Sequence, residues 1–289
     1  MVSLPNFMML LLSQWRAEWL KLLARKRTYI GFAAFLLLEV VILVVFQFEA
    51  PEKLYRRLIV QQGGAFEEYF SALTLGFIVQ AISVGLLGSI YLALVSGDIV
   101  AKESEDGNLR LLLARPISRL RLLALKYATC SCYAFLLVQF IAWTAFLLGL
   151  AMRGWGGGLF AFSPELKIAE LWSWELGLQR YALGAIFLGF SMITVSSVAF
   201  FLSCFKIKPA AATITALSYI LIDSILLRSN LMKSYEFLLV SQYMEIWGRA
   251  YADPIPWALV MRGYSVLIAV NLSLFTLGAA WFQSRDLKS

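Results

Sequence analysis

The residues with the greatest capacity for polar contacts lie in the charged segment 98–126, which separates two long apolar runs. Glu103, Glu105 and Asp106 form an acidic patch near its start, and Pro116 ends a short predicted helix. That helix carries three leucines, which are Leu109, Leu112 and Leu113. Leucines in a charged loop need something to cover them, whether a partner protein, the membrane surface or the rest of the chain. The segment therefore has the composition of a contact surface.

Several kinds of catalytic chemistry are excluded by missing residues. The sequence has no histidine, which rules out Ser-His and Cys-His nucleophilic machinery and His-ligated metal sites. No stretch matches the pattern G-x-x-x-x-G-K-[ST], so the chain has no P-loop of its own for ATP. Cys130, Cys132 and Cys204 are too few for a disulfide framework or a thiolate metal site, and we expect them to be small helix residues.

Two acidic residues, Glu39 and Asp223, stand inside apolar runs. A charged group at the centre of a bilayer costs on the order of 3 kcal/mol, so such residues usually face the interior of a helix bundle. One interpretation gives them a role in a cargo path or its gating, and another makes them groups that fasten helices together. A third treats them as the catalytic pair of a membrane-embedded enzyme, although neither has the Y-D or G-x-G-D setting of intramembrane aspartyl proteases.

The elements that position these residues are membrane spans. Of the 289 residues, 61% are hydrophobic and 15% are charged, against roughly 45–50% and 25% in soluble domains. Six apolar runs reach the length of about 20 residues that a helix needs to cross a bilayer: 28–48, 71–97, 127–152, 181–205, 209–227 and 263–283. We therefore expect an all-α integral membrane protein with six transmembrane helices, forming a single domain over residues 1–289.

Lysine and arginine set the expected orientation. Segments 1–27, 98–126, 206–208 and 284–289 hold 15 of these residues, whereas the longer set 49–70, 153–180 and 228–262 holds 10. The richer set lies on one side of a six-span arrangement, and the positive-inside rule makes that side cytoplasmic. Both termini are then cytoplasmic, and the net charge of +7 is a topology signal that requires no nucleic acid.

Three further segments have helical patterns outside the spans. Residues 8–27 place apolar and polar side chains on different faces, which predicts an interfacial helix in the headgroup layer within segment 1–27. The apolar face holds Leu12, Trp15, Trp19 and Leu22, and the polar face holds Gln14, Glu18, Lys21 and Arg25. Ser163-Pro164 predicts the start of an interfacial helix over 164–178. Residues 231–251 predict a helix at the outer boundary, before the sixth span and tail.

Segment 98–126 resembles the signature of permease subunits of type-2 ATP-binding-cassette (ABC) transporters, which runs roughly E-x-E-x-G-T-L-x-x-L-L-x-x-P-x-S-R and then a lysine. The matching residues are Glu103, Glu105, Gly107, Leu109, Leu112, Leu113, Pro116, Ser118, Arg119 and Lys126. Asn108 stands where threonine is usual. The ending Phe282-Gln283-Ser284-Arg285-Asp286-Leu287 is also similar to the close of such permeases.

The resemblance implies a permease subunit of the cell membrane that exports its cargo and is not itself an enzyme. ATP and magnesium would be bound by a separate cytoplasmic ABC ATPase, present in two copies, and this chain would bind no cofactor. The cargo path would form where two permease subunits, identical or paralogous, meet among the membrane lipids. A non-transporting scaffold or sensor, and the membrane-embedded enzyme, are the alternatives.

The resemblance also implies which residues face the ATPase. Loop 98–126 would contain the coupling helix, and the tight turn before Pro209 would add a smaller contact. The expected contact residues are Glu103, Glu105, Gly107, Leu109, Leu112, Leu113, Pro116, Arg119, Lys206 and Lys208.

Overall fold

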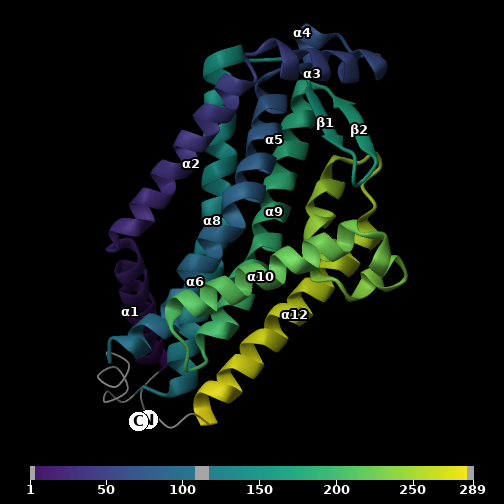
Figure 1. The fold of residues 1–289 in the computed structure, drawn as a ribbon. Helices are drawn as coiled ribbons and strands as arrows, with labels where there is room; N and C mark the ends of the chain where they lie inside the picture. Colours follow the sequence, from purple (N-terminus) through teal and green to yellow (C-terminus); the bar gives the residue numbers. More distant parts are fainter. Residues whose placement is uncertain (1–3, 108–116, 285–289) are drawn as a thin grey trace.

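The computed structural model describes residues 4–107 and 117–284, and these are almost entirely helical (Figure 1). Within these ranges six helices are long and apolar enough to cross a membrane: α2 (Lys26–Val45), the continuous helix Ala72–Glu105, α8 (Arg119–Arg153), α9 (Trp174–Ser203), α10 (Pro209–Arg228) and α12 (Trp257–Ser284). They coincide with the six predicted runs, so the all-α membrane fold is confirmed. α8 and α9 begin earlier than their apolar runs predicted.

The second of these spans is interrupted by a π-helical turn. It consists of α5 (Ala72–Ser83), the turn η1 (Val84–Gly88) and α6 (Ser89–Glu105). Two glycines in the turn, Gly85 and Gly88, suit this local widening because glycine has no Cβ and its backbone departs from α-helical geometry more easily than that of other residues. π turns inside α-helices often mark functional positions, which draws attention to this level of the span.

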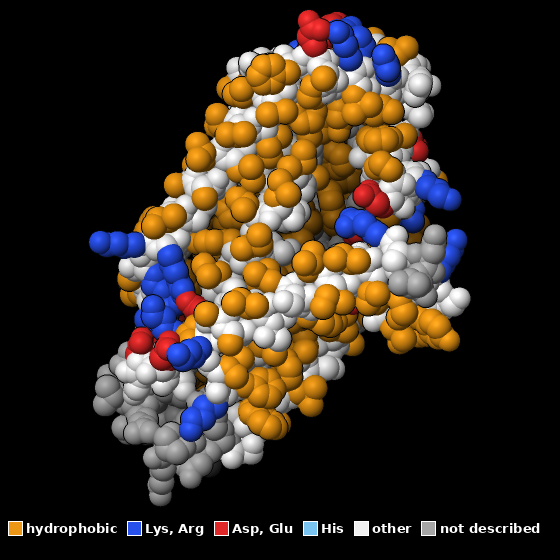
Figure 2. Space-filling view, in the orientation of Figure 1, with side chains coloured by type: hydrophobic (Ala, Val, Ile, Leu, Met, Phe, Trp, Pro, Cys, Tyr) orange, Lys and Arg blue, Asp and Glu red, His pale blue; other side chains and the backbone are white. Residues whose placement is uncertain are grey.

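α9 is the central helix of the bundle. Its most apolar window is 67% buried, whereas those of α2 and α12 are 33% and 28% buried. α6 and α8 pack most extensively against α9, α10 and α12 also contact it, and α2 lies farther out against α5 and α8 (Figure 1). The outer helices carry many exposed apolar side chains, visible as the hydrophobic surface in Figure 2. Lipid or a second membrane subunit is the environment that such a surface requires.

The N-terminal segment forms α1 (Leu4–Leu23), a helix separate from the first span. The chain is extended at Arg25 (φ −78°, ψ 123°), and α2 starts at Lys26, within the basic cluster Arg25-Lys26-Arg27. Glu18 and Leu22 of α1 are buried, while Leu12 and Leu20 are exposed. The helix thus turns part of its polar face into the protein, and its position in the headgroup layer stays a prediction.

The connections opposite α1 pack together into a cap. It contains α3 (Glu49–Gln61), α4 (Phe66–Tyr69), β1 (Leu159–Ser163) and β2 (Ile168–Trp172), seen near the top of Figure 1. The Phe160 N–H donates to the Thr74 hydroxyl over 2.8 Å, and the Ser71 hydroxyl donates to the Gly158 carbonyl over 2.6 Å. These bonds join the hairpin to the start of α5.

The prediction of an interfacial helix over 164–178 is wrong. Residues 159–172 form an antiparallel hairpin in which Leu159 pairs with Trp172 and Ser163 with Ile168. The loop 164–167 closes through a 3.1 Å hydrogen bond from the Lys167 N–H to the Pro164 carbonyl. Proline therefore opens a hairpin loop and starts no helix, and Trp172 ends a strand instead of lying on a helix face.

The segment between the fifth and sixth spans is helical, as predicted for 231–251, but it is broken into three pieces. These are η2 (Asn230–Leu238), α11 (Val240–Met244) and η3 (Glu245–Tyr251), of which η2 and η3 are 3₁₀ helices. Such short pieces need contacts with neighbours to hold them in place. α10, α9 and α12 supply those contacts.

Candidate partner-binding end and membrane pocket

The connections predicted to be cytoplasmic lie at one end of the molecule, here named the loop end and comprising residues 104–107, 117–121, 204–208 and 281–284. A buried cluster joins α6, α8, α9 and α12 there and includes Ile99, Leu123, Cys204 and Phe282. The Arg119 guanidinium donates to the Gln283 carbonyl over 3.1 Å, which ties the start of α8 to the end of α12. The two loops named in the sequence analysis are therefore parts of one surface.

Just inside the loop end, four charged side chains form a closed arrangement that we name the charge ring: Glu18, Lys21, Glu103 and Lys126. The Lys126 ammonium lies 2.8 Å from Glu18 Oε2 and 2.8 Å from Glu103 Oε2. Lys21 lies 2.6 Å from Glu18 Oε1 and 3.3 Å from Glu103 Oε1. The Lys126 side chain is only 1% exposed. The ring carries no net charge, and it binds α1, α6 and α8 to one another.

The ring perturbs the titration of the two α1 residues in opposite directions. Burial alone would raise the pKa of Glu18, but Lys126 and Lys21 outweigh it and hold that pKa below its usual 4.5. Burial alone would lower the pKa of Lys21, but Glu18 and Glu103 outweigh it and hold that pKa above its usual 10.5. Both shifts favour the charged forms, so Glu18 and Lys21 stabilise the fold when they are ionised.

A stability plateau between two pH limits follows from these shifts. The lowered pKa of Glu18 adds stability above about pH 4.5 that is lost as the pH falls through its folded value, and the raised pKa of Lys21 adds stability below about pH 10.5 that is lost as the pH rises. Thermal melting in detergent across pH measures this. We expect Glu18→Gln to reduce the loss of stability at acidic pH, and the exposed Glu105→Gln to leave that loss as in the wild type. Equal losses of stability at acidic pH in all three proteins would contradict this role of the ring.

The predicted ATPase contacts separate into buried and exposed residues. Glu103 is buried in the charge ring, whereas Glu105, Gly107, Lys206 and Lys208 are exposed at the loop end. Four of the predicted contacts lie outside the described residues, namely Leu109, Leu112, Leu113 and Pro116. Contact of each with an ATPase stays a prediction, but the geometry gives Glu103 partners inside this chain.

Local structure explains two further residues of the matched signature. Gly107 has φ +73° immediately after α6 ends, the left-handed conformation that favours glycine beyond a helix C-terminus. The Ser118 hydroxyl accepts a 3.3 Å hydrogen bond from the Arg121 N–H and caps α8, a position at which serine is favoured. The signature therefore encodes the exit from one helix and the entry into the next.

An ion pair that the sequence reasoning missed joins the first two spans near this end. Arg27, in the first turn of α2, pairs with Asp98 of α6, whose side chain is 11% exposed. The Tyr91 hydroxyl donates to the Arg27 and Thr28 carbonyls over 3.2 Å each. The available signal was Asp98 close to the end of an apolar run, with a basic cluster at the start of another.

Glu39 lies deep between helices. It is 0% exposed, and the Thr144 hydroxyl of α8 donates to its Oε1 over 3.0 Å. Its Oε2 has no hydrogen-bond partner among the described residues. The contact fastens α2 to α8, and Glu39 does not line the pocket described below.

Replacing Glu39 with glutamine tests whether fastening is its whole role. Glutamine presents the same carbonyl oxygen to Thr144, so we expect Glu39→Gln to retain the melting temperature and the pH profile of transport. Glu39→Leu removes the acceptor and should lower stability by about 1 kcal/mol. A transport pH profile that changes in Glu39→Gln would instead show that this carboxyl titrates during the cycle.

Asp223 also has partners within the chain. Its carboxylate accepts hydrogen bonds from the backbone N–H groups of Val240 (3.3 Å) and Ser241 (2.6 Å). It thereby ties α10 to the start of α11 and satisfies N–H groups that a helix start leaves free. Glu39 and Asp223 thus sit with different partners on different helices, and they do not form the paired site that the enzyme alternative needs.

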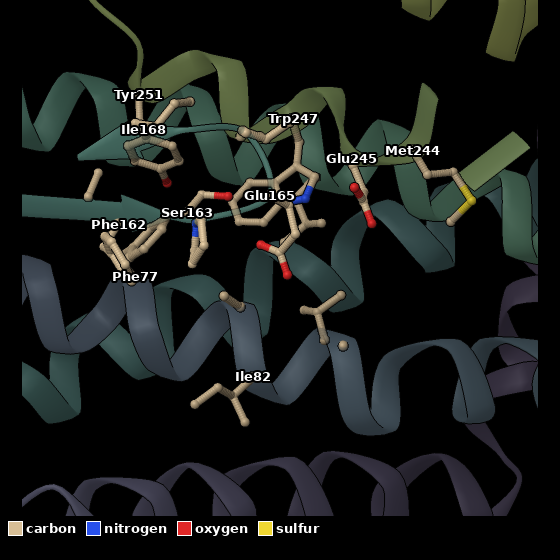
Figure 3. Close-up of a pocket in the computed structure, with 18 of the residues that line it drawn as sticks. Phe77, Ile82, Phe162, Ser163, Glu165, Ile168, Met244, Glu245, Trp247 and Tyr251 are labelled. Carbon is tan, nitrogen blue, oxygen red and sulfur yellow. The ribbon is translucent and has the colours of Figure 1, made fainter. Parts of the chain in front are cut away.

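A pocket of about 480 Å³ opens away from the loop end. Its walls come from α5, η1, the β1–β2 hairpin, α9, α10, α11 and η3. Figure 2 shows it as a hollow in an apolar surface with acidic and basic side chains at its edge. Figure 3 shows Glu165, Trp247 and Glu245 along one wall, across from Phe77 and Ile82 of α5.

Among the described residues, three charged side chains line this pocket, and they come from connections opposite the loop end or from the end of α10. The Arg228 guanidinium lies 3.4 Å from Glu245 Oε1 and 3.8 Å from Glu165 Oε1. Burial raises the pKa of Glu245; Arg228 opposes the rise and Glu165 adds to it. The sequence reasoning missed this group because its members are far apart in the chain and meet only through the hairpin.

Comparison with known proteins shows which family the sequence resembles. The profile described as "ABC-2 family transporter protein" matches residues 15–223. A stretch of 81 residues is 31% identical to "Uncharacterized protein YhcI" of Bacillus subtilis (strain 168), covering 28% of this chain and 26% of that protein. The chain thus matches about a quarter of the length of this curated relative.

Proposed function

This chain belongs to the ABC-2 family of transporter proteins, and from that premise we propose that it is the permease subunit of an ATP-driven exporter whose ATPase is a separate cytoplasmic protein. The family and the six apolar helices make it a multi-pass transport protein of the cell membrane. The direction of transport, the separate ATPase and the route of coupling are the proposed parts.

The observation that carries the proposal is the composition of the loop end. Two connections, after α6 and before α10, come to one surface and present Glu105, Lys206 and Lys208 to solvent. Exposed charges of both signs suit a polar partner surface. The matched signature runs through the first of these connections, and the resemblance makes it the coupling helix that an ATPase moves.

The charge ring supports a route for that movement into the membrane. Glu103 lies two residues before Glu105 on α6, and its ion pairs join α6 to Lys126 of α8 and to Lys21 of α1. A displacement of the loop by the ATPase would therefore move three helices as one body. Rigid-body movement of this kind couples a chemical site to a distant transport site.

Transport further requires a second membrane subunit, identical or paralogous. The outer helices α2, α10 and α12 leave broad apolar surfaces exposed, on which such a subunit and lipid would pack. Two permease subunits and two ATPase subunits would make the complete exporter, with ATP and magnesium held by the ATPase subunits and none by this chain.

The proposal is tested by extracting the full-length chain in native-like lipid from its own cells and identifying what co-purifies. We expect an ATPase with a P-loop, and ATP hydrolysis that follows the complex. ATP-dependent cargo movement by the complex in vesicles then separates a transporter from a scaffold or sensor. A chain that co-purifies with no P-loop ATPase would overturn the proposal.

A further inference from the structure

The pocket between α5, the β1–β2 hairpin and η3 has a charged mouth and an apolar floor. We propose that it is the binding site for an amphipathic molecule that bears an amine, and that this molecule belongs to the cargo class of the exporter. The inference rests on the proposed function, which it deepens by naming the chemistry of what is carried.

The walls of the pocket suit an apolar chain or ring system. Its lining includes Phe77, Ile82, Phe162, Ile168, Met244 and Trp247. A volume of about 480 Å³ falls within the range of roughly 300–1,000 Å³ typical of small-molecule sites. Methionine and aromatic side chains adapt to differently shaped apolar ligands.

The mouth of the pocket favours a cation. Glu165 and Glu245 supply two carboxylates, against one guanidinium from Arg228, and these are the charged residues that line the pocket in the described part of the chain. Arg228 is 61% exposed and its contact with Glu165 is loose at 3.8 Å, so one carboxylate is left for a ligand. Trp247, whose ring type attracts cations best, lies on the same wall.

A glycine in the lining bears on the pocket independently of the charges. The π turn brings Gly85 to the pocket wall, where an added Cβ would meet nothing within 4 Å. A larger side chain at this position would therefore enter open space.

The experiment measures saturable binding of radiolabelled dodecylamine to the full-length chain in nanodiscs of phosphatidylcholine. We expect dodecylamine to bind with an apparent Kd at least tenfold lower than that of dodecyl sulfate, and the double variant Glu165→Gln/Glu245→Gln to lose this tenfold preference. Glu175→Gln, an exposed change outside the pocket, is the matched control. Gly85→Leu should weaken dodecylamine binding severalfold without altering any charge, because its side chain enters the open space.

A parallel arm identifies the source of the amine. In nanodiscs of phosphatidylethanolamine, weaker apparent binding of dodecylamine would show that the lipid headgroup competes for the site, and unchanged binding would point to a free amphiphile; both agree with the proposal. Equal binding of dodecylamine and dodecyl sulfate, or wild-type binding by the double variant and by Gly85→Leu, would overturn it.

The cargo inference and the proposed function can be contradicted independently of each other. If the double variant binds normally while the ATPase still co-purifies, the cargo inference falls and the permease assignment stands. If no ATPase co-purifies while charge-selective binding persists, the pocket is a ligand site of a protein that is not an ATP-driven exporter.

Discussion

Lys126→Met should lower the free energy of unfolding by about 3–5 kcal/mol. The lysine is 1% exposed and lies 2.8 Å from both Glu18 and Glu103, so its removal leaves two buried carboxylates with only Lys21 to compensate them. An uncompensated buried charge is among the few causes of such large destabilisation by one substitution. Unfolding by denaturing detergent in mixed micelles would measure it.

Two comparisons make this result specific to the ring. Lys102→Met changes a neighbouring exposed lysine and should alter stability by less than about 0.5 kcal/mol. Adding Glu103→Gln to Lys126→Met removes one stranded carboxylate, so the double variant should be more stable than Lys126→Met alone. If Lys126→Met and Lys102→Met have the same stability, the ring does not hold α1, α6 and α8 together.

Exchanging the charges of Glu105 and Lys208 should weaken association with the ATPase at least tenfold and abolish most ATP-dependent transport. Both side chains are exposed on the two connections of the loop end, and like charges placed opposite one another across an interface cost several kcal/mol. The double variant Glu105→Arg/Lys208→Glu keeps the net charge, so general electrostatic steering is unchanged. Neither residue belongs to the charge ring, so folding should be preserved.

The measurement is co-purification of the ATPase together with transport in vesicles. Glu175→Arg/Lys233→Glu makes the same exchange at exposed positions away from the loop end and should behave as the wild type. Normal association and transport in Glu105→Arg/Lys208→Glu would show that the partner docks elsewhere. Glu103→Arg is unsuitable for this purpose, because it places a third cation against Lys21 and Lys126 and disrupts the fold itself.

Features set by local sequence could be predicted well. A bilayer demands long apolar helices, so composition and run length located all six spans. The cap at Ser118 uses a residue type that helix starts favour. In each case the physical cause acts within a few residues of the element that it determines.

Features that depend on distant contacts could not be predicted in the same way. The β1–β2 hairpin forms against Ser71 and Thr74, far away in the sequence, and its glycine-rich approach and Pro164 fit a loop before a helix equally well. Glu18 has the spacing of a polar helix face, yet its partner Lys126 lies 108 residues away. The acidic residues of the pocket have no local pattern, because the hairpin and η3 bring them together.

The side of the membrane on which residue 105 lies tests most directly the claim that a cytoplasmic ATPase binds the loop end. A cysteine at Glu105→Cys should react with a membrane-impermeant maleimide in inside-out vesicles and not in intact cells. Trp155→Cys, at a side chain that is 76% exposed on the opposite set of connections, should show the reverse, and the wild-type chain sets the background from its own three cysteines. Labelling of Glu105→Cys in intact cells would put the loop end outside the cell, where no cytoplasmic ATPase can drive it.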